Sequence, residues 1–173
     1  MIDDSVLNTA RRYARKCLSD GRYAHTLRVA DTAEMLANLH GLDPEKARLA
    51  AFLHDSAREV EEEEMLRIAK EEGIPLGERE REKPILLHGP VAARLARKEL
   101  GVEDEEVLEA VRVHTTGEPG MGSISLALYV ADKIEPDRSQ PGVDNLRRLA
   151  QESLERATAS ALEASISYNE RRD

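Results

Sequence analysis

The 173 residues, 40% hydrophobic and 34% charged, have the length and balance of one soluble globular domain. A net charge of −9 excludes a broad nucleic-acid surface, and no apolar run is long enough to span a membrane. Residues 1–4 lack the pattern of a secretory signal and Cys17 is the single cysteine, so we expect a cytoplasmic protein without disulfides or cysteine metal sites.

Apolar residues recur at helical spacing almost throughout the chain, which predicts an all-α domain without internal repeats. The first and last predicted helices, at about 4–18 and 143–168, have the character of scaffold. The second, at about 22–40, places His25 on an apolar stripe that faces the core. Taken alone, such a histidine is more often a satisfied core residue than a ligand. His40 ends the same helix, where its ring suits the helix dipole, and we expect no functional role for it.

The third predicted helix begins with a capping aspartate, Asp43, and Pro44 in its first turn. It continues as an apolar run that ends in His54 and Asp55. Both side chains lose hydration in an apolar setting, so the pair needs a partner. A cation is the simplest one, because it neutralises the carboxylate and uses the lone pair of the imidazole.

Two further histidines lie at predicted helix ends. His88 follows the apolar residues 85–87 and precedes a helix that we expect to begin with Pro90. His88 could therefore simply cap that helix. His114 lies on the apolar face of a helix predicted at about 102–116, so its ring points inward from the last turn.

The segment 123–135 is ambiguous, because its large apolar residues alternate as in a strand. We predict a helix, since the segment is long for a strand, ends at Pro136 and has no partner strand. Asp132 closes this helix, and burying it is costly unless a positive group meets it. Taken alone, Asp132 is better explained by a surface position or by a salt bridge to Lys133 or Arg138.

Four histidines and two aspartates thus face into or end apolar stripes on five separate segments. They are His25, His54, Asp55, His88, His114 and Asp132. Ligands of this kind suit iron, manganese, zinc or nickel. Six ligands are more than one ion takes from protein if it keeps positions open for water and substrate, which points to two ions.

One histidine, a histidine–aspartate pair and a distant aspartate form an ordered set: His25, His54-Asp55 and Asp132. This set resembles the signature of the HD-domain metal-dependent phosphohydrolases over about residues 20–140. The run Ala-Asp-Lys-Ile-Glu-Pro-Asp-Arg at 131–138 is similar to that of the bacterial YqeK family. The resemblance implies a single HD-domain bundle over 1–173, with N- and C-terminal helices packed on the 20–140 core. It also implies symmetrical hydrolysis of diadenosine tetraphosphate to two ADP, with bound iron.

The resemblance further implies how the ligands divide between the two ions. One ion is held by two histidines and two aspartates, namely His25, His54, Asp55 and Asp132. Asp55 bridges to a second ion, which His88 and His114 hold. The expected nucleophile is metal-activated water that attacks an inner phosphorus in line with the departing ADP.

Residues beside the ligands are expected to act on the substrate. The catalytic set is Asp55, Arg58 and Lys133. The expected phosphate contacts are Arg58, Thr115, Thr116, Lys133 and Arg138. Arg58 stands where we expect a lysine, and it can lie on the helical face of His54, although a surface pair with nearby glutamates is as plausible.

Three alternatives stay open at this point. Another HD-type phosphohydrolase, such as a nucleotidase, would use the same metal ligands. A nucleotide-binding protein without turnover would keep the fold alone, and a helical scaffold would carry scattered core histidines. The residues do not determine whether the chain forms a homodimer.

Overall fold

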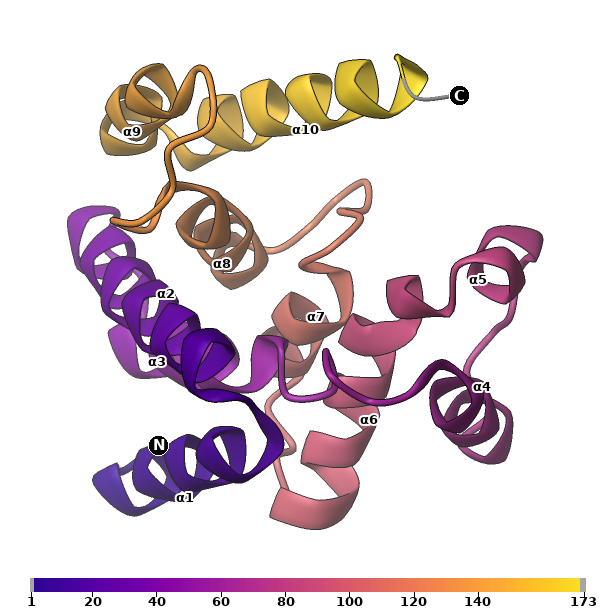
Figure 1. The fold of residues 1–173 in the computed structure, drawn as a ribbon. Coiled ribbons are helices and arrows are strands. Elements are labelled where there is room, and N and C mark those ends of the chain that lie inside the picture. The colour runs from indigo at the N-terminus through magenta and orange to yellow at the C-terminus, as the bar shows by residue number, and fades with distance from the viewer. Residues whose placement is uncertain (1, 172–173) are drawn as a thin grey trace.

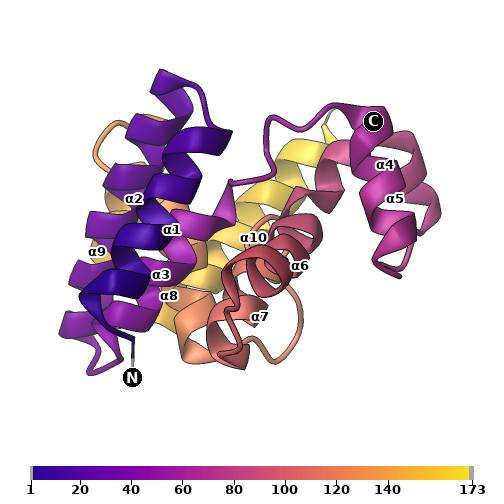
Figure 2. The ribbon, with the colours of Figure 1, turned by 90° about the horizontal axis from the view of Figure 1, so that it is seen from below.

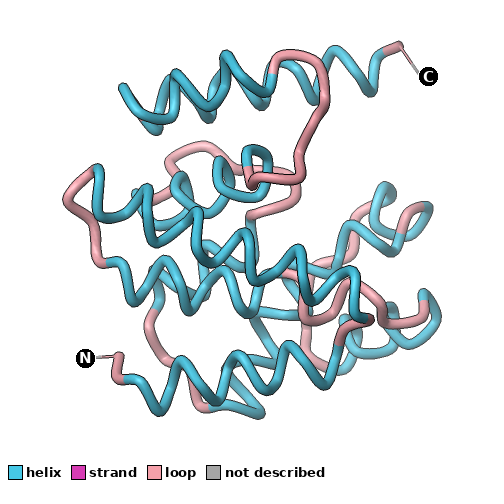
Figure 3. The backbone as a smooth tube through the Cα atoms, turned by 60° about the vertical axis from the view of Figure 1, so that its left-hand side comes forward, coloured by secondary structure: helices cyan, strands magenta, loops and turns pink. Residues whose placement is uncertain are grey.

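The computed structural model describes residues 2–171 and contains helices but no strand in that range (Figure 1, Figure 3). The helices are α1 (Asp4–Cys17), α2 (Asp20–Leu39), α3 (Pro44–His54), α4 (Glu62–Glu71), α5 (Glu78–Glu82), the 3-10 helix η1 (Pro84–Leu87), α6 (His88–Leu100), α7 (Glu105–Val113), α8 (Ser123–Ile134), α9 (Val143–Glu152) and α10 (Leu154–Glu170). The all-α prediction is confirmed, including the helix at 123–135. None of these helices combines the length and the apolar character that a membrane crossing needs.

Helix α3 is the centre of the bundle. It packs along α2 and contacts α1, α6, α7 and α8, while α9 and α10 lie over α8 (Figure 1). Figure 2 shows α4 and α5 on the far side of the molecule from α1 and α2. Because other helices surround α3, its C-terminal end lies in the interior of the bundle. That end carries His54 and Asp55.

The local sequence explains where the central helices begin and end. Asp43 accepts hydrogen bonds from the N–H groups of Glu45 and Lys46 and so caps α3. Asp104 caps α7 in the same way, and Gly101 ends α6 with a φ of 67° that favours glycine. These caps determine where the helices that reach the interior begin or end.

Two predicted helix boundaries and one predicted helical face are wrong. Helix α6 begins at His88 rather than at Pro90. The helix expected over 143–168 is broken at Ser153, whose backbone is extended and whose side chain caps α10. Helix α3 ends at His54, so Arg58 lies in the following turn and does not share a helical face with His54.

Candidate metal centre

The structure brings all six predicted ligands together in one buried cluster. They come from α2, the end of α3, the start of α6, the end of α7 and α8. The side chain of His54 is fully buried, and those of Asp55 and His114 are nearly so. His25 therefore lies in a polar cluster and is not an isolated core histidine.

Asp55 lies between two groups of imidazoles, one facing each carboxylate oxygen. Its Oδ2 is 3.4 Å from Nε2 of His54 and 3.8 Å from Nε2 of His25. Its Oδ1 is 3.3 Å from Nε2 of His88 and 3.5 Å from Nε2 of His114. Each oxygen therefore belongs to a different trio of ligand atoms, and atoms within a trio lie within 4.8 Å of one another.

Asp132 joins the trio of His25, His54 and Asp55. Its Oδ1 is 3.0 Å from Nε2 of His25 and 3.8 Å from Nε2 of His54. The first half of the cluster thus offers four ligands and the second half three, with Asp55 shared.

The imidazoles are held in one tautomer by hydrogen bonds to backbone carbonyls. Nδ1 of His54 lies 2.6 Å from the carbonyl oxygen of Ala51, and Nδ1 of His88 lies 2.6 Å from that of Ile85. His114 makes the same contact within its own helix at 2.7 Å. A carbonyl only accepts, so each Nδ1 carries the proton. The lone pair of each ring is then on Nε2, the atom directed at the cluster.

Glu135 plays the corresponding role for His25, although no function was predicted for it from the sequence. Its Oε1 is 3.1 Å from Nδ1 of His25, and its Oε2 accepts a 2.7 Å hydrogen bond from Nε of Arg28. The side chain is buried. A carboxylate behind a ligating imidazole orients the ring and raises its basicity.

The electrostatics of the cluster favour ionised carboxylates. Burial would raise the pKa of Asp55, but the surrounding imidazoles outweigh it and hold this pKa well below its usual range. For Asp132, burial is likewise outweighed, mainly by the hydrogen bond from His25, and its pKa is also far below the ordinary value. Burial lowers the pKa of His54, which favours the neutral ring that a metal requires.

These donors fit a divalent metal ion. The Nε2 atom of His54 is buried and has no hydrogen-bond partner within residues 2–171. The Nε2 atoms of His88 and His114 are 3.0 Å apart, although both carry lone pairs in the tautomer set by the carbonyls. A cation held by His88 and His114 would remove this repulsion, and a cation in the other trio would use the unpaired nitrogen of His54.

Cationic side chains border the carboxylates of the cluster. Arg138 donates from Nε to the carbonyl of Asp132 at 2.8 Å and from Nη2 to its Oδ1 at 3.2 Å. Nζ of Lys133 lies 3.9 Å from Oδ2 of Asp132, and burial lowers the pKa of this lysine. Arg22, which the sequence did not single out, places Nη1 3.2 Å from Oδ2 of Asp55.

The remaining residues that were predicted to contact phosphate lie at different distances from the cluster. The hydroxyl of Thr115 is 3.2 Å from Nε2 of both His88 and His114. Thr116 is exposed, and its side chain bonds to no residue in the described range. Arg58 is half-buried in the turn after Asp55, and its backbone N–H donates to the carbonyl of Asp55 at 2.8 Å.

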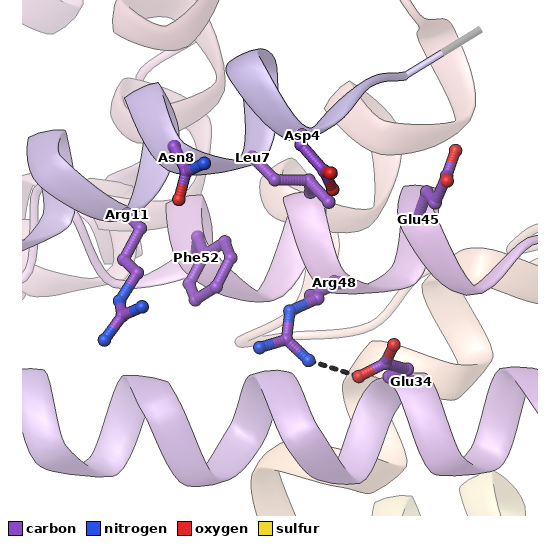
Figure 4. Close-up of a pocket in the computed structure, with 8 residues that line it drawn as sticks. All are labelled: Asp4, Leu7, Asn8, Arg11, Glu34, Glu45, Arg48 and Phe52. Carbon is purple, nitrogen blue, oxygen red and sulfur yellow. Dashed lines mark hydrogen bonds and ion pairs between the residues drawn. The ribbon is translucent and has the colours of Figure 1, made fainter.

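Two hollows of the surface lie apart from the cluster. One of about 320 Å³ is bordered by α1, α2 and α3, where Arg48 pairs with Glu34 beside Phe52 (Figure 4). The other, of about 550 Å³, lies along α6 and α7 and is lined by Pro90 and Leu108 among others. None of the six candidate ligands lines either hollow.

A helical bundle around a buried cluster of histidines with a shared aspartate defines a class of metal-dependent hydrolase. Residues 22–161 match the HD domain family, and the chain belongs to that family. It is 42% identical over 151 residues to the symmetrical bis(5'-nucleosyl)-tetraphosphatase of Bacillus subtilis (strain 168), covering 87% of this chain and 81% of that protein. The symmetrical enzyme of Staphylococcus aureus (strain NCTC 8325 / PS 47) is 40% identical, with coverages of 83% and 74%.

A solved structure supports the same family assignment. The crystal structure of an HD superfamily hydrolase from Clostridium acetobutylicum, described as involved in NAD metabolism, superposes with a TM-score of 0.91. That protein is 38% identical, and the match covers 95% of this chain and 87% of the other. The resemblance found from the sequence motifs is therefore confirmed at the level of the family.

Proposed function

We propose that the protein is a cytoplasmic, metal-dependent hydrolase that cuts diadenosine tetraphosphate symmetrically into two ADP. The observation that carries this proposal is Asp55, whose two oxygens face two separate pairs of histidines. A pure binding protein has no need of such a shared carboxylate. The relatives named as symmetrical tetraphosphatases support the choice of substrate.

Two transition-metal ions would occupy the cluster, with iron our first choice and manganese, nickel or zinc as alternatives. The first would be held by His25, His54, Asp55 and Asp132, and the second by Asp55, His88 and His114. When bound, such a pair supplies a water nucleophile at neutral pH and neutralises charge on the phosphoryl group.

The cations at the edge of the cluster would bind the tetraphosphate. The whole chain carries a net charge of −9, so a polyanion needs a local concentration of positive groups. Arg138 and Lys133 flank Asp132, and Arg22 contacts Asp55. Metal binding at Asp55 competes for the oxygen that Arg22 contacts, which leaves this guanidinium available to a phosphate.

The turns after α3 and α7 would supply the other contacts. Thr115 holds its hydroxyl beside the second trio, where it can donate to a phosphate oxygen. Arg58 follows Asp55 and has no side-chain hydrogen bond or ion pair within the described residues, so its guanidinium is free for a phosphate. Thr116 is exposed and would contact only a part of the substrate that lies outside the cluster.

The test is to purify the protein without oxygen, load it with iron and identify the products from diadenosine tetraphosphate. Two ADP support the proposal, whereas ATP with AMP contradicts it. A panel with nucleoside monophosphates and NAD distinguishes another HD-type hydrolase. If His54→Ala keeps the fold and turnover persists, the metal-centred account fails.

A further inference from the structure

Arg147, on α9, binds the backbone of the segment that leaves α8 beside the metal centre. Its Nε donates to the carbonyl of Ile134 at 3.1 Å. Its Nη2 donates to the carbonyl of Glu135 at 3.1 Å and to that of Arg138 at 2.9 Å. Figure 1 shows the chain leaving α8 in a loop and then rising into α9. Arg147 also donates to the carbonyl of Pro136 at 3.5 Å, so one guanidinium holds four carbonyls of a tight turn.

Two side chains of that turn reach the metal centre. Glu135 contacts Nδ1 of His25, and Arg138 holds both the carbonyl and the carboxylate of Asp132. The turn is closed by a 2.9 Å hydrogen bond from the N–H of Arg138 to the carbonyl of Glu135. Any shift of this turn therefore moves a candidate phosphate-binding group and the partner of a candidate ligand together.

The chemistry of the contact is specific to arginine. The last carbonyls of α8 have no helical partner and carry the negative end of the helix dipole. A planar guanidinium presents donors in a fixed fork, so it can bind several carbonyls at once, whereas a lysine ammonium acts as a point charge. The side chain is about one-third exposed, which leaves the fork partly shielded from water.

We propose that Arg147 is a positioning residue for the substrate phosphates, acting through Arg138. The inference rests on the proposed function, in which Arg138 binds phosphate. Loss of the fork frees the turn, so Arg138 spends less time in its binding geometry and affinity for the nucleotide falls. Glu135 is also bonded to Arg28, and the metal is kept saturating, so the metal ligands stay in place and the chemical step changes little.

The chain offers a matched control in the next residue. Arg148 lies on the same helix, but within the described residues it bonds only to Glu152 and Asn145, both in α9. Its replacement removes a charge of the same sign at nearly the same place without touching the turn. A difference between the two variants therefore reports the fork rather than the net charge.

The experiment is a double-mutant cycle on the metal-loaded protein with Arg147→Ala, Arg138→Ala and the pair, beside Arg147→Lys and Arg148→Ala. The dissociation constant for ADP and the KM and kcat for diadenosine tetraphosphate are measured for each folded variant. We expect Arg147→Ala to raise Kd and KM about tenfold with kcat within about threefold. In the Arg138→Ala background the same change adds less than about twofold.

Arg147→Lys keeps the positive charge, so it still tests the inference if Arg147→Ala does not fold. It should retain the melting temperature and still show the weakened Kd. Additive effects of the two alanine changes, a Kd restored by lysine, or an equal effect of Arg148→Ala overturns the inference. A wild-type protein that binds ADP without turnover refutes the proposed function separately, because the cycle is still read from Kd.

Discussion

Replacement of Asp55 by asparagine tests whether one carboxylate serves two metal positions. Asparagine matches the volume of aspartate, so the packing at the end of α3 is preserved. It keeps one acceptor oxygen and replaces the other with an amide donor. The native oxygens lie 3.3–3.8 Å from the Nε2 atoms of His25, His54, His88 and His114. At least one trio therefore loses the oxygen ligand that Asp55 supplies, and both trios lose the negative charge of the carboxylate.

The magnitude follows from what the ligand contributes. Removing only an outer partner of a ligand costs about 10–100-fold in metal affinity, so losing a ligand costs at least as much. We expect the number of bound ions per chain to fall from about two in the wild type to about one or fewer in Asp55→Asn. His88→Ala should keep about one, because the four ligands on the Asp132 side remain.

The assay is elemental analysis with calorimetric titration under anaerobic conditions, and circular dichroism confirms the fold. His40→Ala is the control, because this histidine lies outside the cluster and bonds to the carbonyl of Ala150. Unchanged occupancy in Asp55→Asn, or loss of both ions in His88→Ala, would refute the bridging role.

Three further predictions concern the surroundings of the cluster. Glu135→Gln should weaken metal binding about 10–100-fold, because the ring of His25 loses its carboxylate partner; equal metal titrations of variant and wild type would count against this role. Gly89→Ala should destabilise the fold by about 1–3 kcal/mol and lower occupancy of the second trio, because a Cβ there meets the carbonyl of Arg112 at 2.7 Å. Gly21→Ala, with open space around it, is its control in urea unfolding, and equal midpoints would contradict the packing argument. Burial raises the pKa of Asp104, but Lys46 and the α7 N–H groups outweigh it, so its folded pKa lies below the ordinary value. Its stabilisation is present above about pH 4 and lost as pH falls through the folded pKa, so Asp104→Ala should cost about 1 kcal/mol at pH 7 and less at pH 3; a cost independent of pH would contradict it.

The ligands could be predicted from the sequence because each ends or faces an apolar helical stripe. His54 and Asp55 follow a buried run, and Asp132 does the same in α8. Periodicity thus places such residues in the interior, where buried ionisable side chains need one another or a cation as partners. The shared role of Asp55 is an expectation of the family resemblance that the distances now support.

The outer partners could not be predicted in this way. Glu135 bonds to His25 across 110 residues of sequence, and Arg22 reaches Asp55 across 33. Their places depend on how α8 and α2 pack, which helical spacing does not encode. The sequence signals for Glu135 were its position one helical turn after Asp132 and its place in the run at 131–138. The break at Ser153 was missed for a related reason, because one capping serine outweighs a continuous apolar stripe.

The central claim is symmetrical, metal-dependent cleavage, and product identity tests it most directly. Diadenosine tetraphosphate is incubated with one anaerobic, iron-loaded preparation whose metal content has been measured, and the nucleotides are separated by ion-exchange chromatography. The account predicts ADP as the sole nucleotide product, with release abolished in His54→Ala. ATP and AMP in equal amounts, or ADP release that is independent of metal, would contradict it.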